Sequence, residues 1–571
     1  MKKVSIFLLI AAFAAVSAVA LAACGGGSSS TSSSSETTSE SSSGGGETES
    51  GGESGEGSEG GTLKGAYTSF PDYMDPQISY TAEGWTAMRP VYIPLLTYKH
   101  APEAEGSEII PGLAKELPKV TNGGKTYTLF LREGLKYSNG EPIKAGDFKY
   151  AVERCFLTNS GGSPFYADIA GAEQFAKTKK GGISGIKVNE KTGEIVINLN
   201  QPAGTFPNEL ALMFVAPVPQ NTPNEDQSAS PPPASGPYMI TSSQPGRGWE
   251  YERNPYWAKD NGKQMPEIPS GHVDKIEIEV QRNQSTQVND IESGKLNWIF
   301  DPPPTDRYQE VKEKFEGTQF TAEPTISTYY FWMNSTVEPF NNLKVREAVN
   351  YAVDPAALER IYTGQIVGTQ QILPPGMPGY KKIELFPHNV AKAKELVAES
   401  GVKDKEITVW TDSESPNNDA GTYYQGVLEE IGFKVELKIL NPDNYFTVIG
   451  NTSTPNLDTG FADWFEDFPH PNDFFDILLN GESIQSTNNQ NFSQINVKPL
   501  NEKINKLSEE QLGSQQETEY AELDEEFMKE ATWAPYGTRT LALFVSENIN
   551  LETAIWNPTF ETELTSLEFK E

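Results

Sequence analysis

The sequence predicts an α/β protein whose folded body has at least two lobes. Residues 62–571 form a body of 510 residues, which is more than a single compact core usually contains. Ile407–Trp410, Tyr424–Ile431 and Lys434–Ile439 have the patterns of a strand, a helix and a strand, and this succession is typical of a parallel sheet. Aromatic residues make up 11% of the chain, so the body has much aromatic surface to bury or to offer to a ligand.

Local patterns predict further elements along the body. Apolar alternation and β-branched content predict strands at Lys125–Leu131, Ile183–Val188, Glu194–Leu199 and Asp274–Val280. The second and third of these flank a turn-forming stretch, so we expect them to pair as a hairpin. Amphipathic patterns predict helices at Ala145–Leu157, Leu343–Ala352 and Asn389–Ser400. Pro219–Pro237, rich in Pro, Asn and Ser, is expected to cross between the lobes.

The N-terminus has the residue order of a secretory signal peptide. Lys2 and Lys3 form a basic start, and Val4–Ala20 is an apolar run without charge. Small residues follow, as they do before a signal cleavage site. We therefore expect residues 1–23 to be a signal peptide that the mature protein lacks.

The residues at the end of this signal peptide indicate how the protein is attached to a membrane. Leu21 to Cys24 (LAAC) resembles a bacterial lipobox. The resemblance implies a lipid on Cys24 and anchoring to the outer face of the cell membrane. An ordinary signal peptide with an incidental cysteine is the alternative. Residues 24–61 are almost entirely Gly, Ser, Thr and Glu after the cysteine, which predicts a disordered tether.

Charge and cysteine content exclude some classes of protein. The formal net charge is −34, which argues against nucleic-acid binding because such proteins need a basic surface. The chain has two cysteines, Cys24 and Cys155. With Cys24 lipidated, no intramolecular disulfide can form. Cys155 lies in a predicted helix, and we expect it to be a small buried residue.

Eight motifs follow one another along the body, at Ile110–Ala114, Tyr127–Glu141, Ala145–Arg154, Gly236–Tyr238, Asn254–Trp257, Asp290–Gly294, Pro339–Asp354 and Asp463–Phe475. Together they resemble the family 5 extracellular solute-binding proteins, a group that binds peptides and nickel. Any one of these motifs would be weak evidence. Their common order over the whole body is a specific likeness.

The resemblance implies a two-lobed clamp of the periplasmic-binding-protein type, with a small subdomain inserted in the first lobe. The expected boundaries are 62–98, 218–325 and 535–571 for lobe I, 99–217 for the insert and 326–534 for lobe II. Thr325–Asn334 should be the first crossover between the lobes, and Thr532–Arg539 should lie near the return. Such clamps enclose a ligand by hinge closure.

The resemblance also implies the residue that meets the amino group of a peptide. Burying that ammonium group requires a carboxylate partner, and Asp467 matches the Asp that plays this role in peptide-binding relatives. Trp464 matches an aromatic residue that lines the side-chain pocket. The alternative is that Asp467 caps the following helix while Trp464 packs in the core. Asp463 and Glu466 depart from the small residues usual in relatives, and we expect them to face solvent.

Three further aromatic residues are candidates for ligand contacts. Tyr330 and Trp332 share one face of the expected crossover strand, where they would contact a peptide backbone or pack between the lobes. Phe461 stands where some relatives carry a basic residue. No Arg occurs between Ile361 and Thr538, so a bidentate clamp for a ligand carboxylate is absent from this part of the chain.

The expected function is therefore that of a binding protein without catalysis or cofactor. It would act as a monomer that delivers peptides to the permease of an ABC importer. Oligosaccharide binding is an alternative within the same fold. Nickel binding is less favoured because the four histidines lack paired spacing, although His470 falls in the ligand segment. A secreted glycoside hydrolase is the alternative of another class, but the sequence contains no nucleophile elbow, phosphate loop or zinc motif.

Overall fold

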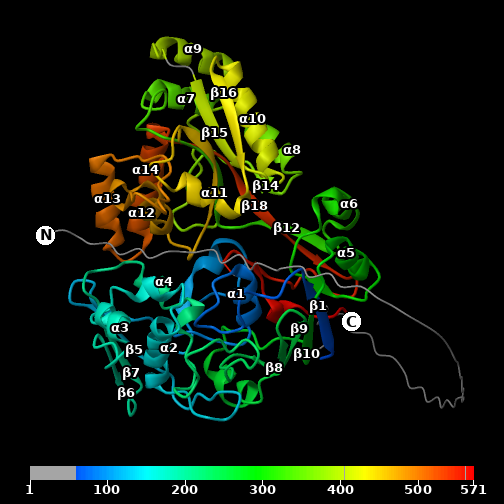
Figure 1. Cartoon of the computed structure of the whole chain (residues 1–571). Coiled ribbons are helices and arrows are strands. Elements are labelled where there is room, and N and C mark those ends of the chain that lie inside the picture. The colour runs from blue at the N-terminus through cyan, green and yellow to red at the C-terminus, as the bar shows by residue number, and fades with distance from the viewer. Residues whose placement is uncertain (1–59, 404–405, 560) are drawn as a thin grey trace, which may run out of the picture.

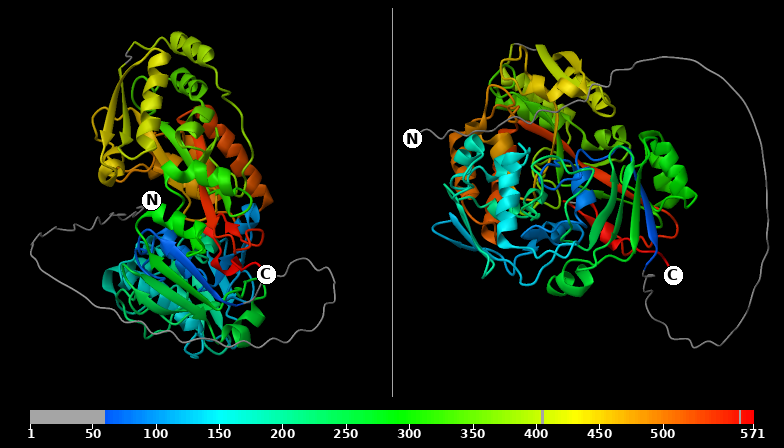
Figure 2. Two further views of the ribbon diagram at one scale, coloured as in Figure 1. Left: turned by 90° about the vertical axis from the view of Figure 1, so that its right-hand side faces the viewer. Right: turned by 60° about the horizontal axis from the view of Figure 1, so that its bottom comes forward.

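The computed structural model describes residues 60–403, 406–559 and 561–571, and these form two lobes joined at a waist (Figures 1 and 2). Lobe II is the body built around the buried side chains from Ile326 to Tyr536, and lobe I contains the remaining body. The predicted signal peptide, the lipidated Cys24 and nearly all of the predicted tether lie outside the described residues. Within the described ranges, no helix combines the length and apolar character needed to cross a membrane.

Lobe I combines part of a large mixed sheet with a separate small one. Its part of the large sheet has the order β11-β1-β10-β9-β8, with strands at β1 Thr62–Tyr67, β8 Tyr238–Gln244, β9 Gly248–Arg253, β10 Lys275–Val280 and β11 Trp298–Ile299. The small sheet has the order β4-β5-β7-β6, at β4 Lys119–Thr121, β5 Thr126–Phe130, β6 Ile186–Asn189 and β7 Glu194–Asn198. The helices are α1 Ala82–Met88, α2 Ala145–Leu157, α3 Ala172–Thr178, α4 Phe206–Glu209, α5 Gln284–Glu292 and α6 Thr305–Phe315. Two short ribbons complete the lobe, β2 Leu96–Tyr98 with β3 Ile109–Pro111, and β19 Trp556–Asn557 with β20 Glu561–Thr562.

Lobe II continues the large sheet in the order β16-β15-β17-β13. Its strands are β13 Ser327–Met333, β15 Glu406–Asp412, β16 Lys434–Leu440 and β17 Thr459–Phe465. Its helices are α7 Leu343–Ala352, α8 Pro355–Ile361, α9 Val390–Ser400, α10 Asn417–Glu430, α11 Pro442–Ile449, α12 Asn472–Leu479, α13 Lys498–Ser508 and α14 Ser514–Glu530. Figure 1 shows α12, α13 and α14 at one end of this lobe, next to the waist.

Strand β18, Trp533–Val545, runs from one lobe into the other and joins the two halves of the large sheet. Its first residues pair with β13 of lobe II. Its last residues pair with β12, Phe320–Pro324, and with β11 of lobe I. Between these regions it pairs with the short strand β14, Ile366–Val367. The chain also passes from lobe I to lobe II between β12 and β13, so both connections are extended and lie side by side.

Most of the elements that local patterns predict lie at or near their predicted positions. Helices α2 and α7 have the predicted bounds, and the predicted hairpin is the antiparallel pair β6 and β7. The predicted strand–helix–strand unit is β15, α10 and β16, and its two strands are parallel. These strands form because their branched and aromatic side chains pack against helices on the sheet faces.

The prediction that Pro219–Pro237 crosses between the lobes is wrong. The segment stays in lobe I, where the amide of Gln227 donates to the Asp75 carboxylate and the hydroxyl of Tyr92 donates to the carbonyl of Pro232. Proline-rich composition indicates an irregular connection but carries no information about which bodies it connects.

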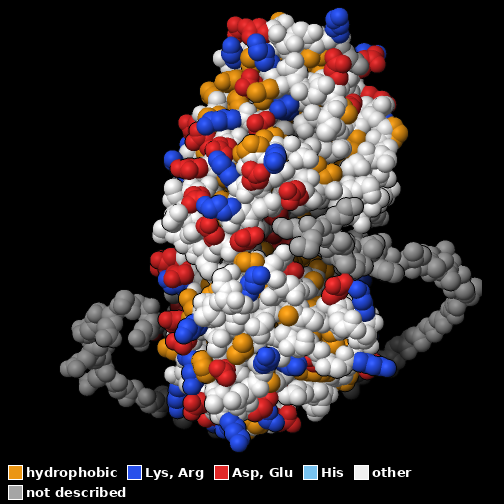
Figure 3. Space-filling view, turned by 90° about the vertical axis from the view of Figure 1, so that its left-hand side faces the viewer, with side chains coloured by type: hydrophobic (Ala, Val, Ile, Leu, Met, Phe, Trp, Pro, Cys, Tyr) orange, Lys and Arg blue, Asp and Glu red, His pale blue; other side chains and the backbone are white. Residues whose placement is uncertain are grey.

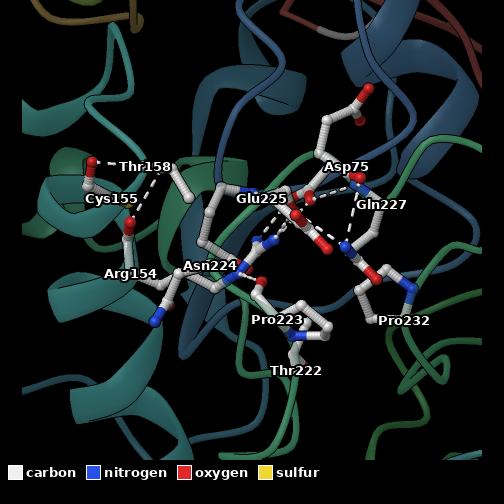
Figure 4. Close-up of polar contacts among 12 residues, drawn as sticks. Asp75, Arg154, Cys155, Thr158, Thr222, Pro223, Asn224, Glu225, Gln227 and Pro232 are labelled. Carbon is white, nitrogen blue, oxygen red and sulfur yellow. Dashed lines mark hydrogen bonds and ion pairs between the residues drawn. The ribbon is translucent and has the colours of Figure 1, made fainter.

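A buried ion pair fastens α2 to the N-terminal segment of lobe I (Figure 4). The Arg154 guanidinium donates to both carboxylate oxygens of Asp75 at 2.6 Å, and both side chains have an exposed fraction of 0%. Arg154 also donates to the carbonyls of Pro223 and Glu225. Its fifth donor faces the side-chain oxygen of Gln77 at 2.9 Å, so every donor of this desolvated cation has an acceptor, which such burial requires. The adjacent Cys155 is buried, as predicted, and burial raises the pKa of its thiol.

Replacing Arg154 by methionine should lower the free energy of unfolding by about 3–5 kcal/mol, because the Asp75 carboxylate would remain buried without its cation. Urea unfolding followed by tryptophan fluorescence measures the change. Lys434→Met removes the exposed ion pair with Glu406 and should leave the transition where it is. Equal effects of the two substitutions would show that the buried pair is not a structural fastening.

Candidate functional site

One hydrogen bond joins the two lobes at the residue predicted to bind an amino group. Asp467 lies in the loop after β17 of lobe II, and its carboxylate accepts a hydrogen bond of 2.7 Å from the hydroxyl of Tyr80 in lobe I. The two residues are 387 positions apart in the chain. Asp467 is thus part of the surface where the lobes meet.

Tyr80 is held in place by its own loop and by aromatic packing. The Asp72 carboxylate accepts from the amide of Tyr80 at 2.7 Å and from the hydroxyl of Ser79 at 2.6 Å. The Tyr80 ring stacks near Trp85 and meets Phe214 edge to face, with centroid distances of 5.7 and 5.2 Å. A ring fixed on several sides presents its hydroxyl in one direction.

Asp473 holds the opposite side of this contact. It lies in the first turn of α12, and one oxygen of its carboxylate accepts from the indole Nε1 of Trp464 and from the amide of Asp467, each at 3.1 Å. The loop that carries Asp467 is therefore fixed by the helix that follows it. Asp467 does not cap this helix, whose N-cap residue is Pro471.

The loop also inserts an aromatic side chain into lobe I. Phe468 belongs to the hydrophobic core of lobe I and meets Phe165 edge to face at 6.2 Å. Further polar contacts join the lobes nearby, including the side chain of Gln511 donating to the hydroxyl of Tyr127 at 2.8 Å. The lobes are consequently in direct contact around Asp467.

Burial raises the pKa values of the carboxyl groups where the lobes meet. It raises the pKa of Asp467 to about 6, although the hydrogen bond from Tyr80 opposes the shift. It also raises the pKa of Asp473, and the charge of the neighbouring Asp467 adds to that rise. In the part of the chain that the structure describes, neither carboxylate has an ion-pair partner. The loop therefore presents negative charge that a ligand cation would stabilise.

A second polar group lies near the start of β13 and the end of its antiparallel partner β17. Asp463 is directly opposite Tyr329 in the ladder, and burial raises its pKa to about 6 while a hydrogen bond from Tyr329 and the charge of Arg539 oppose the rise. Arg539 lies on β18 between the regions that pair with the two lobes. It stands immediately after the long stretch without arginine, and it places a cation at the waist.

The structure places the predicted aromatic residues in two kinds of environment. Trp464 is half-buried beside Asp467, as described above. Tyr330, Trp332 and Phe461 lie in the core of lobe II with exposed fractions of 0, 0 and 1%. Tyr330 stacks on Trp533 at 3.5 Å, and the Trp332 indole donates to the carbonyl of Phe461. Their packing supports the sheet beneath the loop, and a direct ligand contact for them stays a prediction.

Two expectations about acidic residues are corrected here. Asp463 and Glu466 do not face open solvent: both are half-buried, and burial is the main cause of the raised pKa of each carboxyl.

The sequence missed Tyr80 and Asp473 as parts of the site. Asp473 belongs to the same motif as Asp467 and could have been found there, but no local pattern indicates Tyr80.

His470 does not provide a metal site. It is 1% exposed, its Nδ1 accepts from the amide of Asn472, and burial lowers its pKa to about 3. Within the described ranges, no three His, Cys, Asp or Glu side chains are grouped as metal ligands. This arrangement gives no support to nickel as the ligand.

Two lobes joined by paired extended strands, with unpaired carboxylates where they meet, define a ligand-binding clamp. The family model "Bacterial extracellular solute-binding proteins, family 5 Middle" matches residues 108–486. The match covers more than half of the chain. This protein therefore belongs to the family 5 bacterial extracellular solute-binding proteins, as the sequence motifs implied.

Curated relatives with similar sequences are solute-binding proteins. The oligopeptide-binding protein OppA of Bacillus subtilis is 26% identical over 398 residues, which are 64% of this chain and 69% of the relative. The periplasmic oligopeptide-binding protein OppA of Salmonella typhimurium is 26% identical over 382 residues, 63% and 67% of the two chains. The glutathione-binding protein GsiB of Escherichia coli K12 is 25% identical over 332 residues, 56% and 59%.

Solved structures confirm the two-lobed α/β fold. A clavulanic acid biosynthesis oligopeptide binding protein has a TM-score of 0.79 at 21% identity, covering 90% of this chain and 96% of its own. The open, unliganded murein tripeptide binding protein MppA has a TM-score of 0.76 at 21% identity, covering 90% and 98%. DppA from Helicobacter pylori, solved with the peptide STSA, has a TM-score of 0.65 at 20% identity, covering 90% and 99%.

Replacing Asp463 by asparagine should stabilise the protein at neutral pH and not at pH 3.5. Below the usual pKa of 3.8 the carboxyl is protonated in the folded and unfolded states alike. As pH rises through about 6, the folded protein must ionise a buried carboxyl, so the stability that its neutral form contributes is lost. A pKa near 6 in place of 3.8 corresponds to at most about 3 kcal/mol.

The difference in melting temperature between Asp463→Asn and the wild type, measured from pH 3.5 to 7.5, tests this expectation. The difference should grow in favour of the variant between pH 4 and pH 6.5. The exposed Asp306 on α6 provides the control substitution Asp306→Asn, whose difference should stay flat. A flat difference for Asp463→Asn would contradict the assigned cause.

Proposed function

We propose that this protein captures peptides with a free amino terminus between its lobes. The observation that carries the proposal is the Asp467 carboxylate, which lies where the lobes meet and is bonded to a neutral phenol and not to a cation. An ammonium group entering there would gain a charge-assisted hydrogen bond and would relieve the cost of the desolvated carboxylate. A neutral sugar would relieve much less of that cost.

Names of the relatives support the same cargo. Two OppA proteins are described as oligopeptide-binding, and the DppA structure contains a bound peptide. Family membership supports binding without catalysis and transfer of the cargo to the permease of an ABC importer. The LAAC pattern before Cys24 supports a lipid anchor on the outer face of the cell membrane, with the body held on a tether. The protein would act as a monomer.

Closure would be coupled to binding through the same groups. Tyr80 and Asp467 come from different lobes, so a ligand amine held by Asp467 contacts both lobes only when they are closed. A ligand that interacts differently with the open and closed forms shifts the population toward the closed form. The extended connections β12–β13 and β18 allow this movement while keeping the lobes in register.

Substituting Asp467 by asparagine should weaken the binding of free tripeptides by at least about 30-fold, since truncating one partner of a buried charged pair costs at least about 2 kcal/mol. Isothermal titration calorimetry with trialanine measures the effect on the purified full chain. N-acetyl-trialanine, which lacks the free amine, should bind the wild type as weakly as trialanine binds Asp467→Asn. Asp306→Asn is the matched control and should bind like the wild type. Unchanged affinity of Asp467→Asn for trialanine would refute the amine-anchor role.

A further inference from the structure

A second contact between the lobes joins the end of helix α13 in lobe II to the loop before α4 in lobe I. The amide of Gly204 donates to the carbonyl of Ser508 at 2.7 Å. Ser508 is the last residue of α13, and Gly204 lies two residues before the start of α4. Figure 1 shows α13 above α4 at the left of the waist. A backbone hydrogen bond therefore crosses from one lobe to the other.

This bond satisfies a carbonyl that the helix itself leaves over. The last carbonyls of an α-helix have no partner within the helix. The next amides of the chain, those of Glu509 and Glu510, donate to carbonyls earlier in α13. The Ser508 carbonyl receives its bond from lobe I, so the end of α13 is capped by the opposite lobe.

The side chain of Gln511 makes the other half of this contact. Its amide nitrogen donates to the hydroxyl of Tyr127 at 2.8 Å, and that hydroxyl donates to the carbonyl of Ala203 at 2.6 Å. Tyr127 is 0% exposed, and its ring packs on Phe206 with a centroid distance of 4.8 Å, so the hydroxyl is held in place. We call this set of residues the lobe latch, which consists of Gly204, Tyr127, Ser508 and Gln511.

Only glycine fits at position 204 while the lobes are in this contact. Gly204 is buried, and a Cβ atom added to it would lie 1.7 Å from the carbonyl oxygen of Glu510. The three atoms nearest to such a Cβ all belong to Glu510 and Ser508 of lobe II. Gly204 does not have a positive φ, so its own loop would accept another residue. The need for glycine comes from the opposite lobe.

The ion pairs next to the lobe latch stay within lobe II. Lys506 pairs with Glu510 and Glu519, and Lys503 pairs with Glu526. Figure 3 shows this side of the molecule, with acidic and basic side chains interspersed on lobe II. The lobe latch itself consists of hydrogen bonds between neutral groups and of close backbone approach. Salt therefore does not screen it as it screens exposed ion pairs.

We propose that the lobe latch holds the two lobes together whatever the cargo, and that it raises the affinity for every peptide by the same factor. An apparent dissociation constant rises as the fraction of protein in the binding-competent form falls. The latch residues are positioning residues, because they act on the ligand only through the contact between the lobes. The effect on affinity rests on the proposed function, whereas the contact itself is tested without a ligand.

Hydrogen exchange of the Gly204 amide in the purified full chain, without added ligand, tests the contact. This amide is bonded across the waist, so its exchange rate reports how often the lobes separate there. Gln511→Ala removes the neighbouring bond to Tyr127. The exchange should become at least about three-fold faster, the effect of losing one hydrogen bond of ordinary net strength.

Gln515 provides the matched control for this measurement. It is exposed, and its side chain donates to Glu519 of the same helix. Gln515→Ala should leave the exchange of the Gly204 amide as it is in the wild type. Equal rates in the wild type and in Gln511→Ala would overturn the inference, whatever the cargo is.

The affinity for trialanine tests the consequence for binding. Gly204→Ala should bind trialanine at least about ten-fold more weakly than the wild type, because the added methyl group overlaps the Glu510 carbonyl when the lobes meet. Gly426 on α10 is exposed, and a Cβ added there meets nothing within 4 Å. Gly426→Ala is therefore the matched control and should bind like the wild type. Circular dichroism shows whether both variants are folded.

Gln511→Ala should weaken trialanine binding in the same direction, so the test does not depend on Gly204→Ala being folded. Wild-type affinity in both latch variants would overturn the inference and leave the proposed function standing. Failure of the wild type to bind trialanine would overturn the proposed function, and the exchange rate of the Gly204 amide would still decide whether the lobe latch exists.

Discussion

The pairing of β18 with strands of both lobes is the constraint on which the rest of the structure depends. At the junction the amide of Thr325 donates to the carbonyl of Arg539, and the amide of Arg539 donates to the hydroxyl of Ser327. These bonds tie the two connections between the lobes to each other. A hinge movement of one lobe relative to the other would take place about this short region. The two connections also fix how the surfaces of the lobes face each other. This orientation brings the Tyr80 hydroxyl to the Asp467 carboxylate.

The buried carboxylates differ in whether the chain itself supplies a cation for them. Carboxylates that hold the fold are matched within the chain, as Asp75 is by Arg154 and Glu563 is by Arg89 and His100. The Asp467 carboxylate, where the lobes meet, instead accepts a hydrogen bond from the Tyr80 phenol. In the proposed function a ligand cation would stabilise this carboxylate, so the group that holds the ligand would also couple binding to movement.

Much of the fold could be predicted from the sequence because its elements carry strong local patterns. The helix α7 and the parallel unit β15–α10–β16 depend on side-chain spacing that nearby residues determine. Trp464 and Asp467 could be proposed together because they share one short motif. The direction in which Glu466 points was misjudged, since exposure depends on a surface of lobe I that lies far away in the sequence. The prediction that Pro219–Pro237 crosses between the lobes was wrong for the same reason, because the position of the segment depends on residues far away in the sequence.

The sequence by itself determined the family, many of the sheet-forming and helix-forming segments and the acidic character of the chain, and it proposed Asp467 as the candidate anchor carboxylate. Only the tertiary structure decided which partner that carboxylate meets, because Tyr80 approaches it from a segment hundreds of residues away. Burial of Asp467 likewise depends on the contact between the lobes. A pKa depends on the solvent and charges around a group, and local sequence does not contain that environment.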